Sequence, residues 1–220
     1  MRKRVVILGT TMFSAELSYI LKSEDYEVIA FYVDSAFKTS DCYDGLPVYS
    51  SERVENEIDT QSVSFALAIG YSRMNEVRKS KYEQCIIKGY KLLTFISKHS
   101  QIYTEKVGEG SIIMPGTYIG PLSEIGLCIV IRPGTVLAHH DIIGNYNWIA
   151  DGCTFGGGVA VGDNCFIELG TTVRNEISIA NRTLIGAQSY IGMNTEEGKA
   201  YYGVPGKVAD KESFEIINRV

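Results

Sequence analysis

The sequence predicts an α/β domain followed by an all-β parallel β-helix. The β-helix is indicated by an apolar residue at every sixth position, fifteen times without a break: Val107, Ile113, Ile119, Ile125, Ile131, Leu137, Ile143, Ile149, Phe155, Val161, Ile167, Val173, Ile179, Ile185 and Ile191. Glycine often follows the apolar residue, as at Gly108 and Gly120. Stacked short strands give a six-residue period of this length, whereas a helix or a single strand does not.

A second column supports the same register. Four places after each apolar residue the side chain is mostly small, as at Ser111, Thr117, Ser123, Thr135, Asn147, Cys153, Cys165, Thr171, Thr183 and Ser189. Large aliphatic and small side chains can together fill a narrow interior, so both columns are expected to point inward.

The first hundred residues alternate strand-like apolar runs with helical spacing. We expect strands at 4–9, 26–34, 46–49, 63–70 and 91–96, and helices at 12–22 and 73–89. This alternation is typical of a small parallel, Rossmann-like sheet. With the boundary near residue 103, the sequence predicts an α/β domain at 1–103 and a β-helix domain with a C-terminal tail at 104–220. The tail is expected to cover the open end of the solenoid, with 211–220 as a closing helix.

Composition narrows the class of protein. Acidic residues number 26 against 21 Lys and Arg, which gives no basic surface for nucleic acid. No apolar run approaches the length of a membrane span, and the start lacks a signal-like core. The five cysteines have neither metal-like nor disulfide-like spacing. We therefore expect a protein of the reducing cytoplasm, without membrane insertion.

The α/β domain carries a candidate nucleotide site. Gly9, Thr10 and Thr11 follow the first strand, and Asp34 ends the second. Ligands bind at the carboxyl ends of neighbouring parallel strands, so these residues could hold a nucleotide. The loop lacks two of the three glycines of a dinucleotide-binding turn, which disfavours NAD. A plain α/β domain without a ligand is the alternative.

The β-helix carries the candidate chemistry. Its register points His139 outward and places His140 at a turn and Asp141 in the small inward column. With eighteen residues in a coil, Gly157 lies directly above His139, where an imidazole could act as general base and a free N–H could bind an oxyanion. An exposed, functionless histidine is the alternative. Asp141 could accept a hydrogen bond from an imidazole or be satisfied by backbone N–H groups.

These features together resemble the bacterial sugar acyltransferases of the left-handed β-helix superfamily, which include sialic acid O-acetyltransferase-like proteins and nucleotide-amino-sugar N-acetyltransferases. The resemblance rests on the α/β domain, the hexads, the His-His-Asp segment 139–141 and the segment 203–207, Gly-Val-Pro-Gly-Lys. It implies a left-handed helix of about five coils with three hexads in each coil. The family motif, counted back from 143–144, implies that His139 is the general base.

The resemblance also implies the ligands. For coenzyme A it implies Trp148, Gly157, Leu169, Ala187 and Lys207. For the acceptor it implies Gly9, Thr10, Thr11, Asp34 and Tyr71. Two positions depart from the family pattern. His140 replaces the acid that usually follows the base, which leaves open whether His140 or Asp141 assists it. Trp148 replaces a second histidine that contacts the acetyl donor.

We therefore expect acetyl-CoA-dependent N-acetylation of a nucleotide-linked amino-deoxysugar in surface polysaccharide or glycan synthesis, with no metal. O-acetylation of a sugar and transfer of another acyl group are the near alternatives, and a non-catalytic nucleotide-sugar-binding scaffold is a third. A carbonic-anhydrase-like zinc β-helix would need three well-spaced histidines around a metal, and the adjacent pair His139 and His140 leaves too few. The outward columns of His139 and Leu169 form an exposed mixed surface, which predicts a homotrimer.

Overall fold

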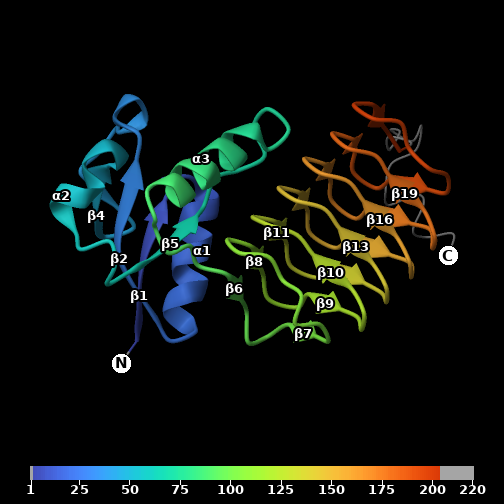
Figure 1. The fold of residues 1–220 in the computed structure, drawn as a ribbon, viewed down its shortest axis with the longest axis horizontal. Coiled ribbons are helices and arrows are strands. Elements are labelled where there is room, and N and C mark those ends of the chain that lie inside the picture. Colours follow the sequence, from blue (N-terminus) through green and yellow to red (C-terminus); the bar gives the residue numbers. More distant parts are fainter. Residues whose placement is uncertain (1, 204–220) are drawn as a thin grey trace, which may run out of the picture.

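The computed structural model describes residues 2–203, which form the two predicted parts side by side (Figure 1). The N-terminal part contains β1 (Lys3–Leu8), α1 (Met12–Ser23), β2 (Tyr26–Val33), η1 (Ser35–Phe37), β3 (Cys42–Tyr43), β4 (Leu46–Ser50), η2 (Ser51–Arg53), α2 (Val54–Glu57), β5 (Ser64–Leu67) and α3 (Glu76–Ile87). Its five strands have the order β3-β4-β2-β1-β5, and all neighbours are parallel except β3 and β4. The predicted parallel α/β sheet is thus confirmed.

Helices cover both faces of this sheet. Alternate residues of β1 point to opposite faces, as they must in a strand. Val5 and Ile7 pack with α1 in a core cluster that continues onto the solenoid, whereas Val6 and Leu8 pack with α3 on the other face. The order of the layers therefore places α1 between the sheet and the β-helix (Figure 1).

Two helix boundaries show how local chemistry sets the elements. Thr11 caps α1, since its hydroxyl accepts from the Ser14 N–H while the Ser14 hydroxyl accepts from the Thr11 N–H. The second helix was predicted from residue 73 but begins at Glu76. Arg73, Met74 and Asn75 all have positive φ, between 52° and 66°, and a helix cannot run through left-handed residues.

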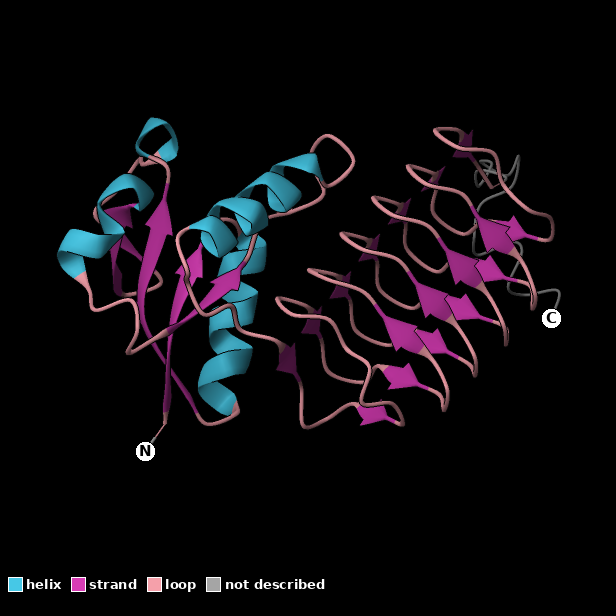
Figure 2. Cartoon of the chain, in the orientation of Figure 1, coloured by secondary structure: helices cyan, strands magenta, loops and turns pink. Residues whose placement is uncertain are grey.

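The solenoid consists of two-residue strands joined by turns (Figure 2). They are β6 (Phe95–Ile96), β7 (Gln101–Ile102), β8 (Ile112–Ile113), β9 (Tyr118–Ile119), β10 (Glu124–Ile125), β11 (Val130–Ile131), β12 (Val136–Leu137), β13 (Ile142–Ile143), β14 (Trp148–Ile149), β15 (Thr154–Phe155), β16 (Ala160–Val161), β17 (Phe166–Ile167), β18 (Thr172–Val173), β19 (Ser178–Ile179), β20 (Leu184–Ile185), β21 (Tyr190–Ile191) and β22 (Ala200–Tyr201). They form parallel sheets of seven, six and four strands.

Each coil visits the three sheets in turn. β11 belongs to the seven-stranded sheet, β12 to the six-stranded sheet and β13 to the four-stranded sheet, and β14 returns to the first. Ile131 pairs with Ile149, eighteen residues later, so the predicted coil length is confirmed. The fifteen apolar positions line the interior, as predicted, together with Ile129, Val159 and Ile177 of the small column.

The strands of the solenoid extend beyond the six-residue repeat, which runs from residue 107 to residue 196. β6 and β7 already pair with β8 and β9, so solenoid pairing begins at residue 95, ahead of the boundary placed near 103. β22 adds a strand beyond residue 196. The closing helix predicted at 211–220 lies outside the described residues.

Candidate active site

The two adjacent histidines lie at one corner of the solenoid. They occupy the turn between β12 and β13, where His140 has a φ of 59°. Both side chains are exposed, and their Nδ1 atoms are 2.9 Å apart. One Nδ1 must donate and the other accept. When His139 donates, its Nε2 is left free to accept a proton.

Gly157 lies directly over the His139 ring, in the next coil. A Cβ built on Gly157 would be 2.5 Å from Cε1 and 2.7 Å from Nε2 of His139, so any larger residue would collide with the ring. The Gly158 N–H donates to the His139 carbonyl at 2.8 Å and fixes the spacing of the two coils. The Gly157 N–H donates to no described residue. This corner thus offers an imidazole and a free backbone donor together.

Asp141 makes no hydrogen bond to an imidazole of the described residues. Its side chain is fully buried in the solenoid, and Oδ1 accepts from the Val159 N–H at 2.8 Å. The ring that meets His139 is His140 instead. Burial raises the pKa of Asp141, against the lowering effects of nearby backbone N–H groups and of the His139 charge. Asp141 therefore points away from the exposed corner because its register turns it inward.

The predicted acceptor loop does form a pocket. A cavity of about 460 Å³ opens at the carboxyl ends of β1, β2 and β5, and its lining includes Gly9, Thr10, Thr11 and Asp34. Gly9 has a φ of 124°, and a Cβ there would come within 2.6 Å of the Ala68 carbonyl oxygen, so the turn requires glycine. The sheet edge thus brings together four of the five predicted acceptor residues.

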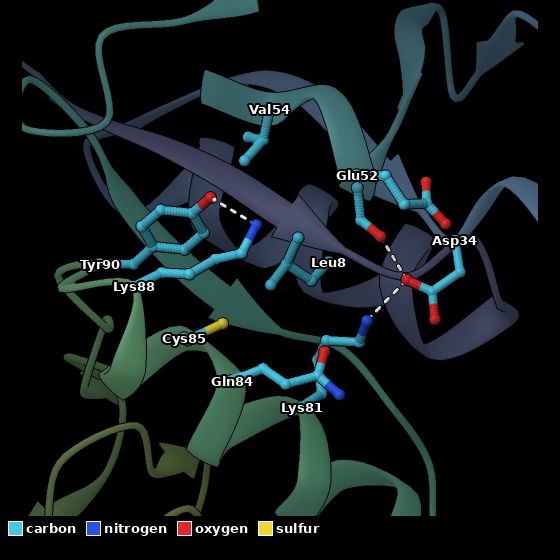
Figure 3. Close-up of a pocket in the computed structure, with 10 residues that line it drawn as sticks. Leu8, Asp34, Glu52, Val54, Lys81, Gln84, Cys85, Lys88 and Tyr90 are labelled. Atoms are coloured by element: carbon cyan, nitrogen blue, oxygen red, sulfur yellow. Dashed lines mark hydrogen bonds and ion pairs between the residues drawn. The ribbon is translucent and has the colours of Figure 1, made fainter. Parts of the chain in front are cut away.

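Lys81 and Ser51 control the charge of Asp34. The Lys81 Nζ is 2.6 Å from Asp34 Oδ1, and the Ser51 hydroxyl donates to the same oxygen. Burial alone would raise the pKa of Asp34, but these two hydrogen bonds and the Lys81 charge outweigh it and lower the pKa. Figure 3 shows Lys81 reaching Asp34 across an adjoining cavity of about 400 Å³. No sequence signal marked Lys81, because its partner lies 47 residues away.

A larger cavity lies between the α/β domain and the seven-stranded sheet. It has a volume of about 630 Å³, and it shares Thr11, Gly70 and Ser72 with the acceptor pocket. Arg132 lines it and bridges the parts, because its guanidinium bonds to Glu16 of α1 and to Asp151 of the solenoid. The two cavities therefore adjoin at the three shared residues.

Four predicted contact residues line this larger cavity: Thr11, Tyr71, Trp148 and Leu169. Trp148, expected at the donor site beside the base, is 6% exposed in the seven-stranded sheet and packs edge-on against Phe13 and Tyr71. Tyr71 stacks on Phe166 with ring centroids 4.1 Å apart, and it lines this cavity, not the Asp34 pocket. The placement of Trp148 follows from the register, which points its side chain outward toward the α/β domain.

The remaining predicted donor residues are spread over the solenoid. Leu169 and Ala187 lie in turns between the seven-stranded and six-stranded sheets, and both are exposed. His139 and Gly157 lie in turns between the six-stranded and four-stranded sheets. Lys207 lies outside the described residues. A single chain therefore does not bring the two columns into one site.

Residues 2–203 contain neither a metal-binding cluster nor a membrane-spanning helix. No group of three or more His, Cys, Asp or Glu side chains is arranged to hold a metal ion there. No helix in that range has the length and apolar character needed to cross a membrane.

Related sequences among known proteins cover about half of this chain. No protein-family model matches the chain. The GDP-perosamine N-acetyltransferase of Escherichia coli O157:H7 is 30% identical over 112 residues, which cover 50% of this chain and 50% of that protein. A bifunctional protein GlmU from Chromobacterium violaceum is 27% identical over 104 residues, 47% of this chain and 20% of GlmU. The chain thus spans half or less of the length of these relatives.

Solved structures match nearly the whole chain. The acetyltransferase domain of PglB from Neisseria gonorrhoeae FA1090 has a TM-score of 0.81 at 21% identity, covering 94% of this chain and 99% of that domain. PerB from Caulobacter crescentus, solved with CoA and GDP-perosamine, has a TM-score of 0.81 at 24% identity, covering 93% and 96%. These similarities confirm the predicted fold class, an α/β domain followed by a left-handed β-helix, and the resemblance to sugar acetyltransferases.

Proposed function

We propose that this protein is an acetyl-CoA-dependent N-acetyltransferase acting on a nucleotide-linked amino-deoxysugar. The observation that carries the proposal is the corner where Gly157, whose N–H donates to no described residue, lies over the His139 imidazole. The names of the similar proteins, a GDP-perosamine N-acetyltransferase and an acetyltransferase domain solved with acetyl coenzyme A, support the donor and the acceptor class.

The chemistry follows from the two groups. The His139 Nε2 takes a proton from the acceptor amine as its nitrogen attacks the thioester carbonyl of acetyl-CoA. The Gly157 N–H donates to the oxyanion that develops on that carbonyl. The intermediate collapses with release of coenzyme A as a thiolate, which takes the proton from His139 Nε2 and so restores the base. His140 accepts from the Nδ1–H of His139 throughout, and so keeps Nε2 in the form that can act as a base.

The acceptor is assigned to the pocket at the carboxyl ends of β1, β2 and β5. Its ionised Asp34 can accept hydrogen bonds from nucleoside hydroxyl or amino groups, and Lys81 supplies a cation beside it. The sugar can pass by Thr11, Gly70 and Ser72 into the larger cavity. This pocket is the reason for preferring a nucleotide-linked sugar to a free one.

The site is completed by a second copy of the chain. The α/β domain packs on the seven-stranded sheet, whereas His139 occupies the corner between the other two sheets. The acceptor pocket of one copy must therefore meet His139 of another, with Leu169 and Ala187 lining the donor groove between them. Leu169 and Met193 are 52% and 70% exposed, and a neighbouring copy would cover them. A homotrimer around a threefold axis satisfies this arrangement for all copies at once.

The setting is a reducing cytoplasm, where precursors of surface polysaccharides or glycans are assembled. The five cysteines are all unpaired, and four of them are buried. Lys207 would contribute to binding the coenzyme A phosphates.

The direct test measures thiol release from acetyl-CoA with a panel of UDP-, dTDP- and GDP-linked amino sugars. We expect release with one nucleotide class, together with product whose acetyl group is on nitrogen. Matched sugars with hydroxyl in place of amine test O-acetylation, and propionyl-CoA tests other acyl groups. Nucleotide-sugar binding without thiol release from any acceptor would replace the proposal with a non-catalytic scaffold.

A further inference from the structure

One buried polar atom stands out within the described residues. Asp141 Oδ2 has no hydrogen-bond partner, although the residue is fully buried. An ionised carboxylate in this position would leave a charged oxygen unsatisfied inside an apolar solenoid, which is costly. The other oxygen, Oδ1, is satisfied by the Val159 N–H.

The neighbours of Asp141 in the small inward column show what this position ordinarily does. Seven of them donate to the carbonyl fifteen residues later: Ser111, Thr117, Thr135, Asn147, Cys153, Cys165 and Thr171. Ser111, Ser123 and Asn147 also accept from the N–H eighteen residues later. The column therefore ties each coil to the next by a donor and an acceptor.

Asn147 is the closest guide to Asp141. Its Oδ1 accepts from the Cys165 N–H, and its Nδ2 donates to the Gly162 carbonyl. Asp141 repeats the first bond with Val159 but, when ionised, has no hydrogen for the second. The carbonyl in the corresponding place is that of Gly156, which accepts from no described residue.

We propose that Asp141 is a neutral carboxylic acid whose Oδ2–H donates to the Gly156 carbonyl and thereby positions the Gly157 N–H over His139. The Gly156 carbonyl and the Gly157 N–H belong to one peptide unit, so fixing the oxygen fixes the direction of the N–H. Asp141 is thus a positioning residue that acts through the backbone. This role rests on the proposed acyl transfer, whereas the protonation state does not.

The surroundings favour the neutral form. The Val159 N–H donates to the carboxyl from the coil above, the N–H groups of Ala138 and Gly158 lower its pKa, and Ser123 in the coil below accepts from the Asp141 N–H. The large side chains of the solenoid core are apolar. Among the described residues, His139 is the titratable group that acts on it, and it lowers the pKa of Asp141, but burial is the larger effect and raises that pKa. Since the folded pKa lies above the unfolded one, Asp141 stays protonated in the folded state over a range of pH where the unfolded chain has lost the proton.

Three substitutions separate the roles. Asp141→Asn and Asp141→Thr keep a donor, as Asn147 and Thr135 do. Asp141→Val matches threonine in shape without a donor, and Val159 directly above shows that valine fits this column. With the trimer intact, we expect kcat of Asp141→Asn and Asp141→Thr to be within about twofold of wild type. For Asp141→Val we expect kcat to fall by about tenfold, which is less than the loss caused by removing an oxyanion donor altogether. KM for acetyl-CoA should stay constant.

The pH profile adds a readout that a structural role would not move. Wild-type kcat should fall at alkaline pH as Asp141 ionises, whereas Asp141→Asn should not show that fall. If kcat fell as far in Asp141→Asn as in Asp141→Val, the proposal would be overturned, because the loss of a required carboxylate charge would then explain both results. Wild-type kcat in the valine variant would overturn the positioning role.

The protonation state is measured without any activity. The infrared difference between wild type and Asp141→Asn at pH 7 should contain the C=O band of a protonated carboxyl, and a carboxylate band in its place would overturn the proposal. Wild type should also lose unfolding stability relative to Asp141→Asn as the pH rises from about 4. If no acceptor is acetylated by any preparation, the proposed function fails while these two measurements still decide the state of Asp141.

Discussion

His139 and His140 face each other through their Nδ1 atoms, 2.9 Å apart, although they are adjacent in the chain. Adjacent residues of a strand point to opposite sides, so this contact depends on the left-handed φ of His140. His140 therefore takes the place of the acid that usually follows the histidine in the sugar acyltransferases that this sequence resembles, and its imidazole can still orient His139.

Replacing His139 by alanine should lower kcat by about two to four powers of ten, the usual contribution of a positioned base. His140→Ala should cost about tenfold, because it removes the partner that selects the tautomer but leaves the base. Affinity for acetyl-CoA should be nearly constant in both, as measured by calorimetry. A larger loss for His140→Ala would identify His140 as the base and shift the register by one.

Gly157→Ala should remove most activity, because the new methyl group would meet the His139 ring at about 2.5 Å. Gly157→Leu should also block acetyl-CoA, whose thioester needs the same space. The alanine variant should melt near the wild-type temperature, because the exposed His139 ring can turn away from the methyl group and Gly157 does not have positive φ. Steady-state kinetics and a thermal melt of one preparation measure both effects, and wild-type kinetics would place the donor site elsewhere.

The shared site can be tested by mixing two inactive chains. His139→Ala removes the base, and Ser72→Trp should block the passage between the two cavities that Ser72 lines. Random mixed trimers should regain about one quarter of wild-type activity, because half of the bases and half of the pockets are intact and they come from different chains. Each variant alone should be trimeric by light scattering and inactive. Mixed trimers without activity would place base and pocket in one chain.

Lys81→Met should raise KM for the nucleotide sugar, by about tenfold if the lysine also contacts the diphosphate. The pKa of Asp34 should rise in this variant, since the ion pair that lowers it is lost. Lys88→Met is the matched control, because Lys88 pairs with Glu55 and does not line the acceptor pocket. Equal KM values for the two variants would exclude Asp34 and Lys81 from acceptor binding.

Much of this protein could be predicted from the period of its residues alone. Six-residue spacing defined the strands, the coil length and the inward columns, and it placed Gly157 over His139. Periodicity succeeds here because each coil contacts its neighbours at a fixed distance along the chain. The acceptor loop was predictable for a similar reason, since the carboxyl ends of parallel strands share one edge.

Only the tertiary structure decided the contacts between segments that are not related by the six-residue repeat. Arg78 is completely buried, and its guanidinium donates to the carbonyls of Cys128, Tyr146 and Asn147, which fastens α3 to the solenoid. Trp148 became part of that domain contact, and Asp34 acquired Lys81 as its partner. These pairings depend on how the α/β domain docks against one face of the prism. The docking is set by the shape and hydrogen bonding of both surfaces at once, which a local residue pattern does not encode.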